Sequence, residues 1–148
     1  MIKICKTSKT LAAAFHSGKS AHTTNTAVYT TLPMEVYNCM SERMQKKLCY
    51  KQPDVTMFFH GEPIAWRIGK HIYATLGGWN NITAMRRINA VLDMPYVFFQ
   101  WQRRACFGRL LDDYINGKDI TIIMDIDTKD FYIQKYSVKS QRSLLLIQ

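Results

Sequence analysis

The feature that most constrains the fold is a set of three short β-type segments separated by turns between residues 55 and 76. Residues 55–60 are mostly β-branched or aromatic and end at a Gly-Glu-Pro turn. Residues 64–68 end at a Gly-Lys turn, and residues 71–76 complete the set. Because turns this short force neighbouring strands to run antiparallel, the sequence predicts a three-stranded antiparallel meander.

Two segments with helical spacing flank this meander. Apolar residues recur every three or four positions within residues 33–50, and Met85, Ile88 and Leu92 repeat this pattern within residues 83–93. Further strands are predicted at residues 26–30, 96–102, 119–127, 131–138 and 143–147. The predicted fold class is α+β, with an antiparallel sheet built from the meander 55–76 plus strands in 96–126, and two helices on one face.

The N-terminal segment, residues 1–25, differs in composition from the rest of the chain. It contains four lysines and no acidic residue, and Ser and Thr are frequent within it. Low apolar content and a central Gly18 favour a flexible basic arm. A length of 148 residues fits one domain, so the predicted organisation is a flexible arm over 1–25 followed by a single α+β domain over 26–148.

Charge points to the class of partner. Twenty Lys and Arg against eleven Asp and Glu give a net charge of +9, which favours a polyanion or an acidic protein surface. The longest purely apolar run has five residues, 11–15, which excludes a membrane-spanning helix and favours the cytoplasm. The four cysteines have no metal-ligand spacing, so neither a metal nor another cofactor is expected.

A glycine pair before the second helix is the first candidate anion site. Gly77 and Gly78 precede a helix whose first turns contain Arg86 and Arg87, and free amides at a helix start attract anions. The segment lacks the pattern of a Walker loop or a dinucleotide fingerprint. The structural alternative is that the glycines turn the chain, Asn81 or Thr83 caps the helix, and Arg87 pairs with a carboxylate.

An aromatic and basic stretch is the second candidate. Trp101 is followed by Arg103, Arg104 and Arg109, and aromatic side chains beside arginines can stack on unpaired bases. The alternative is an ordinary sheet with one face in the core and the other in water. The remaining predicted nucleic-acid or anion contacts come from the N-terminal segment, namely Lys3, Lys6 and Lys9.

Aspartates provide the only catalytic hypothesis. Asp125 and Asp127 share one face of a predicted strand, and with Asp112 or Asp113 they could hold a divalent metal for nuclease chemistry. The same residues also suit a strand that runs into a turn. No Ser or Cys lies in a nucleophile-elbow context, and the sequence therefore favours a protein that is not an enzyme.

Residues 60–89 resemble a family of small uncharacterised proteins from tailed bacteriophages. The shared features are a Gly-x-x-Ile-Ala turn followed by a Gly-Trp-x-x-x-Thr-x-x-x-Arg run, and the matching residues are Gly61, Ile64, Ala65, Gly78, Trp79, Thr83, Arg87 and Asn89. Glu62 replaces the usual Asn and Ile88 the usual Leu. The resemblance implies a phage origin and a core of a meander followed by a helix, but no activity.

Three functions are ranked from these observations. The first is a phage accessory protein that binds nucleic acid without catalysis in the host cell cytoplasm. The second is an inhibitor that binds an acidic surface of a host defence or nucleic-acid-processing protein, because basic charge also steers protein association. The third is the metal-dependent nuclease. The sequence leaves the oligomeric state open.

Overall fold

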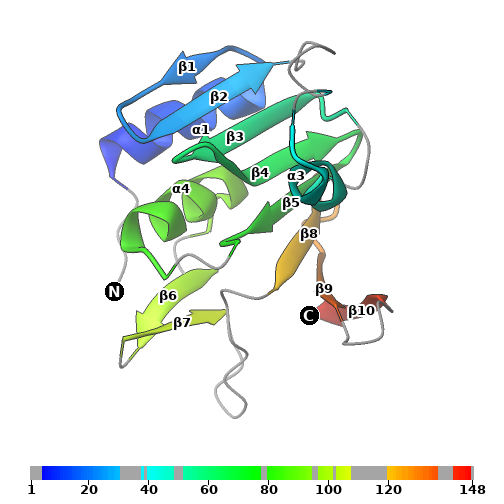
Figure 1. The fold of residues 1–148 in the computed structure, drawn as a ribbon. Helices are drawn as coiled ribbons and strands as arrows, with labels where there is room; N and C mark the ends of the chain where they lie inside the picture. The colour runs from blue at the N-terminus through cyan, green and yellow to red at the C-terminus, as the bar shows by residue number, and fades with distance from the viewer. Residues whose placement is uncertain are drawn as a thin grey trace.

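The computed structural model describes residues 5–30, 38, 40–48, 52–77, 80–94, 97–101, 103–107, 120–136 and 142–147. Its main element is an eight-stranded sheet in the order β1-β2-β3-β4-β5-β8-β9-β10, in which every neighbouring pair is antiparallel. The strands are β1 (Ala21–His22), β2 (Thr26–Thr30), β3 (Val55–Phe59), β4 (Glu62–Ile68), β5 (His71–Thr75), β8 (Thr121–Asp125), β9 (Phe131–Tyr136) and β10 (Arg142–Ile147). The predicted α+β class with an antiparallel sheet is confirmed (Figure 1).

The meander forms as predicted, because β3, β4 and β5 pair in sequence order through two short turns. His60 and Gly61 at the first turn and Gly69 at the second have positive φ angles of 48°, 79° and 59°. Glycine adopts this conformation without the steric cost that other residues meet. The sequence signal at these turns therefore has a direct backbone cause.

Of the strands predicted within residues 96–126, only β8 joins the main sheet, where it pairs with β5. The predicted strand 96–102 is present as β6 (Phe98–Trp101), but it pairs with β7 (Arg104–Phe107), for which no strand was predicted, in a separate two-stranded sheet. The predicted strands 131–138 and 143–147 are present as β9 and β10, which pair with each other and extend the main sheet beyond β8. Short hairpin turns explain both arrangements, since each strand pairs first with its neighbour in sequence.

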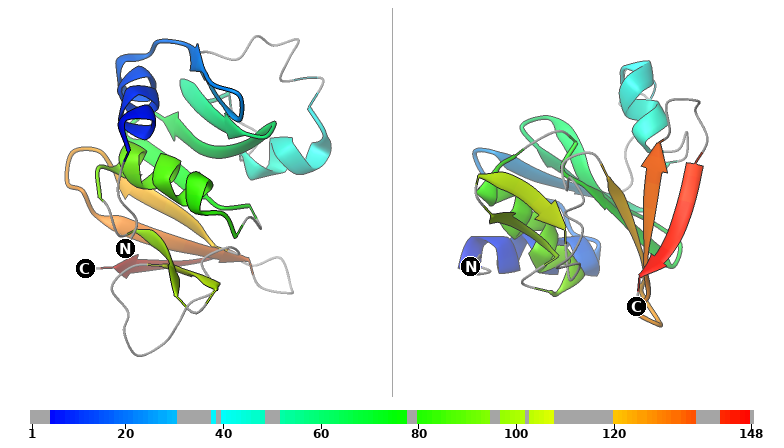
Figure 2. Two further views of the ribbon diagram at one scale, coloured as in Figure 1. Left: turned by 90° about the vertical axis from the view of Figure 1, so that its left-hand side faces the viewer. Right: turned by 90° about the horizontal axis from the view of Figure 1, so that it is seen from below.

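Helices cover the two faces of the sheet unequally. The helices α1 (Lys6–Ser17) and α4 (Ile82–Leu92) lie side by side on one face, next to β6 and β7, whereas α3 (Glu42–Lys47) lies on the other face (Figures 1 and 2). The predicted helix 83–93 is thus confirmed as α4. The predicted helix 33–50 is described only in part, and its described portion includes α3.

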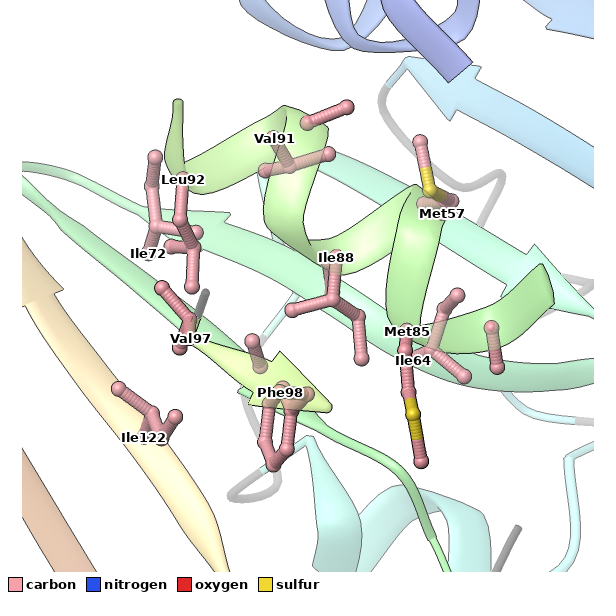
Figure 3. Packing of buried hydrophobic residues seen from close by; sticks show 14 of the residues in the cluster. Met57, Ile64, Ile72, Met85, Ile88, Val91, Leu92, Val97, Phe98 and Ile122 are labelled. Atoms are coloured by element: carbon pink, nitrogen blue, oxygen red, sulfur yellow. The ribbon is translucent and has the colours of Figure 1, made fainter. Parts of the chain in front are cut away.

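The main hydrophobic core fills the space between the sheet and the α1–α4 side. Figure 3 shows Met85, Ile88 and Leu92 of α4 directed toward strand residues, including Ile72 and Ile122. A second, smaller cluster contains Leu48, Phe58 and Trp66 on the α3 side. Because residues from Leu11 to Ile133 contribute to the main core, one core unites α1 with the rest of the fold.

The prediction of a flexible arm over residues 1–25 is wrong for most of that segment. Residues 6–17 form α1, and residues 21–22 form β1. Leu11 and Phe15 of α1 are almost completely buried in the main core. Burying these large apolar side chains stabilises the helix by roughly 1.5–3 kcal/mol each, which outweighs the weak helix propensity of its Ser and Thr residues.

The described part of the chain contains no helix that is long and apolar enough to span a membrane. This agrees with the short apolar runs of the sequence.

Candidate nucleic-acid interface

The side of the molecule formed by α1, α4, β6 and β7 is nearly free of acidic residues, and we refer to these four elements as the basic layer. Residues 1–34 and 76–111, which contain them, include nine Lys and Arg but only one acidic residue, Asp93. The other acidic residues of the described chain belong to α3 and to the strands and turns of the main sheet. Among the described residues, these ranges carry seven Lys and Arg less one Asp, a net charge of +6, whereas the rest carry eight Lys and Arg less six Asp and Glu, a net charge of +2.

Two contacts connect the middle of α4, and the residue before its cap, to other parts of the basic layer. Arg87 Nη1 donates to Ser8 Oγ at 2.7 Å, which fixes the first turn of α1 beside α4. Asn80 Nδ2 donates to the backbone oxygen of Arg103 at 2.8 Å, which fixes the β6–β7 turn beside the segment that leads into α4. Gln100 Nε2 donates to Asn80 Oδ1 at 3.0 Å and reinforces this second link.

Four of the predicted cations lie on the elements that these contacts connect. Lys6 and Lys9 lie in the first turns of α1 and are exposed. Arg103 occupies the β6–β7 turn with a φ angle of 61° and is exposed. Arg86 lies in the second turn of α4 and is half-buried. Sequence separation conceals this grouping, because residues 6–9, 86 and 103 are distant along the chain.

Arg87, in contrast, points into the protein. Its side chain is only 6% exposed, and its Nε donates to Thr26 Oγ1 at 3.1 Å while Nη1 donates to Ser8. Among the described residues its partners are hydroxyl groups and the Cys5 thiol, and no carboxylate forms an ion pair with it. Arg87 therefore connects α4 to α1 and β2, and it is not available to a phosphate at the surface.

Side-chain oxygens already accept hydrogen bonds from backbone amides at and before the start of α4. Asn81 is the N-cap, and its Oδ1 accepts from the backbone amides of Thr83 and Ala84 at 2.8 and 3.2 Å. Gly77 has a φ angle of 60°, and its amide donates to Thr75 Oγ1. The two capped amides are thus already satisfied, which leaves the half-buried Arg86 as the candidate anion contact on this helix. Gly78 lies outside the described residues.

The aromatic stretch forms a tight hairpin that packs against α4. Asn89 of α4 holds both backbone groups of Phe98: its Nδ2 donates to the Phe98 oxygen and its Oδ1 accepts from the Phe98 amide, each at 2.9 Å. Phe98 is completely buried and cannot stack on a base. The side chains of Trp101 and Arg104, and all of Arg109 and Lys3, lie outside the described residues.

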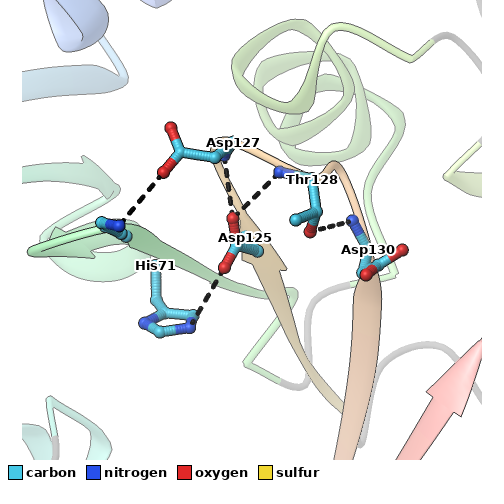
Figure 4. A network of polar contacts seen from close by, with 6 residues as sticks. His71, Asp125, Asp127, Thr128 and Asp130 are labelled. Atoms are coloured by element: carbon cyan, nitrogen blue, oxygen red, sulfur yellow. Dashed lines mark hydrogen bonds and ion pairs between the residues drawn. The ribbon is translucent and has the colours of Figure 1, made fainter.

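The aspartates of the nuclease hypothesis belong to the β8–β9 turn. Asp125 Oδ1 accepts from the amides of Asp127 and Thr128 at 2.8 and 3.0 Å (Figure 4), and the hydrogen bonds from Thr128 and then Asp127 lower the pKa of Asp125. Asp127 pairs with Lys70 at 3.4 Å. The described residues contain no group of three possible metal ligands, and Asp112 and Asp113 lie outside them.

The contacts of two residues of this interface, Asn80 and Cys5, could not be predicted from the sequence. The role of Asn80 depends on Arg103, a contact across the fold that no local pattern indicates. Cys5 has Ser8 and Arg87 as neighbours, and their spacing along the chain signals nothing. No protein-family model matches the chain, and no curated protein or solved structure matches it significantly.

Proposed function

We propose that this protein binds nucleic acid without catalysing a reaction, and that the basic layer is its binding surface. The observation that carries the proposal is that Lys6, Lys9, Arg86 and Arg103 lie on elements, and a turn, that hydrogen bonds connect, and that α1, α4, β6 and β7 contain no carboxylate. The resemblance to phage proteins favours an accessory role in the cytoplasm of an infected bacterial cell.

Nucleic acid suits this surface better than a small anion does. The cations come from α1, α4 and the β6–β7 turn, so they are spread over several elements and do not converge on one point. Regularly spaced phosphates can contact such a set one by one, and each contact releases counterions. Binding of this kind is sequence-independent and weakens steeply as salt rises.

The test is a titration of labelled 30-nucleotide single-stranded DNA, duplex DNA and RNA by fluorescence anisotropy at several salt concentrations. The reporter variant is Lys6→Glu/Lys9→Glu. Both side chains are exposed, and acidic residues suit the first turn of a helix, so the fold is expected to persist. We expect binding to weaken at least tenfold at low salt, and the salt slope to fall by about 0.7–0.9 for each phosphate that the variant no longer neutralises.

The matched control is Lys46→Glu/Lys70→Glu, which makes the same change of charge outside the basic layer. Lys46 lies in α3, and Lys70 lies in the β4–β5 turn. We expect this variant to lose much less affinity than the reporter variant. Equal losses in the two variants would show attraction by net charge alone and would contradict the assigned surface.

The same titration also tests the second candidate partner, an acidic protein surface. The absence of measurable binding to all three nucleic acids at 50 mM salt would overturn the proposal. Binding to polyglutamate under those conditions, abolished in the Lys6→Glu/Lys9→Glu variant, would then favour the inhibitor.

A further inference from the structure

Arg87 is a buried charge that lacks an acidic partner among the described residues. Only 6% of its side chain is exposed to solvent, and arginine stays protonated in proteins. A buried cation is costly unless an opposite charge lies nearby. The hydroxyl groups of Ser8 and Thr26 accept hydrogen bonds from its Nη1 and Nε atoms, but they do not balance its charge.

One neighbouring group can become negative. Cys5 Sγ lies 3.8 Å from Arg87 Nη1 and 3.4 Å from Ser8 Oγ. Because Ser8 Oγ accepts a hydrogen bond from Arg87, its own hydrogen can be donated to Cys5 Sγ. Cys5 also occupies the N-cap position of α1, where the helix dipole favours negative charge.

The geometry points to an ion pair between a Cys5 thiolate and the buried Arg87 guanidinium, which makes Cys5 a site of modification by small disulfides and couples that modification to the docking of α1 on α4. Cys5 is half-buried and a free thiol, so its sulfur is within reach of a small molecule. This inference is independent of the proposed binding of nucleic acid.

The titration of Cys5 agrees with this arrangement. Hydrogen bonds from the side chain and backbone of Ser8 lower the pKa of Cys5 to about 7, the charge of Arg87 also lowers it, and burial opposes them. The titratable and charged groups on the surrounding elements are Lys6, Lys9 and His16 on α1, Arg86 and Arg87 on α4, Tyr29 on β2 and His22 on β1. None is a carboxylate, so nothing on these elements opposes formation of the thiolate.

The reaction is a thiol–disulfide exchange. The Cys5 thiolate attacks one sulfur of the disulfide, a new sulfur–sulfur bond forms to the protein, and the other half of the reagent leaves as a thiolate. The sulfur of Cys5 is neutral in the mixed disulfide. Arg87 then loses its counter-charge, and the contact between α1 and α4 is weakened.

The experiment measures modification by oxidised glutathione on the folded, full-length chain from pH 5.5 to 9.5. Peptide mass spectrometry reports each cysteine separately. We expect the rate of modification at Cys5 to rise with pH, with a midpoint near pH 7. Cys106 is only 2% exposed, so its rate should be lower by about tenfold or more. The glutathione adduct at Cys5 is expected to melt at a lower temperature than the reduced protein.

Two variants test which groups lower the pKa of Cys5. Arg87→Gln and Ser8→Ala are each expected to raise the midpoint by about one pH unit, a tenfold change in the thiol–thiolate equilibrium. Ser8→Ala serves alone if Arg87→Gln does not fold. The control is Lys19→Gln, which removes an exposed charge just after α1 and should leave the midpoint unchanged.

Three outcomes would overturn the inference. The first is a wild-type midpoint near 8.5, the value of an ordinary cysteine. The second is a midpoint in the folded Ser8→Ala variant that equals that of the wild type. The third is an adduct at Cys5 that leaves the melting temperature unchanged, which would separate the reactive thiol from the docking of α1.

Discussion

The helices α1 and α4 lie side by side on the same face of the sheet, yet only α4 is evident from the sequence. α4 begins at an Asn cap and ends where Asp93 adopts a left-handed conformation, with a φ angle of 54°. α1 has no side-chain cap hydrogen bond, and only its end, at Gly18 with a φ angle of 69°, follows a common pattern.

The difference shows which interactions hold each helix. α4 combines a local cap with a buried apolar face, whereas α1 depends on tertiary contacts, namely the burial of Leu11 and Phe15 and the hydrogen bond between Ser8 and Arg87. His16 Nε2 adds a contact of 2.7 Å to the Val91 oxygen of α4. A helix of this second kind forms only with its partner.

The largest expected effect comes from deleting residues 1–17. This removes Leu11, Ala12 and Phe15 from the main core and leaves Arg87 without Ser8. We expect the truncated chain to lose its cooperative thermal unfolding transition, as followed by circular dichroism. If the truncated chain melts cooperatively near the wild-type temperature, α1 is dispensable for folding, which is what a flexible arm would imply.

The two adjacent arginines of α4 should differ strongly in stability measurements. Arg87→Ala removes the buried guanidinium together with its hydrogen bonds to Ser8 and Thr26 and should lower the free energy of unfolding by about 3 kcal/mol. Arg86→Ala should change it by less than about 0.5 kcal/mol and weaken only binding. Urea denaturation of both variants measures the difference, and equal costs would contradict the separate roles.

Asn89 tests the link between α4 and the β6–β7 hairpin. Asn89→Ala leaves the amide and the oxygen of buried Phe98 without their side-chain partner, and we expect a loss of about 2 kcal/mol in urea denaturation. Asn89→Asp retains an acceptor for the amide but loses the donor, so it should also destabilise the protein. If Asn89→Ala is as stable as the wild type, the hairpin is held by other contacts.

The smallest effect is expected at the cap of α4. Asn81→Ala removes the acceptor for two backbone amides and should cost about 1 kcal/mol, whereas Asn81→Ser should retain most of the stability. Thermal melting of the two variants gives the comparison. Identical melting temperatures for Asn81→Ala and wild type would show that α4, like α1, depends on tertiary contacts alone.

Features set by local chemistry were predictable from the sequence. The turns at Gly61 and Gly69 defined the meander, and the apolar spacing of Met85, Ile88 and Leu92 defined α4. The stripe of Ser8, Leu11, Ala12 and Phe15 was present in α1, but the frequent Ser, Thr and Lys obscured it.

The candidate site was only partly predictable, for a different physical reason. Adjacent residues on a helix point about 100° apart, so Arg86 and Arg87 had to face different surroundings, and the sequence could favour Arg86 as the surface residue. It could not show that Arg87 reaches Ser8 and Thr26, because those partners are 79 and 61 residues away in the chain. Contacts at such separations depend on the completed fold.

The most direct test of the central claim, that α1 is a folded part of the basic layer, is native-state hydrogen exchange of its backbone amides. The amides of residues 9–17 donate within α1, starting with Lys9 to the Cys5 oxygen at 3.0 Å. We predict that the amides of the helix interior, around Leu11 and Phe15, exchange as slowly as those in the middle of α4, because both helices open only with the main core. Exchange in α1 at the rate of an unstructured peptide, with α4 still protected, would contradict the account.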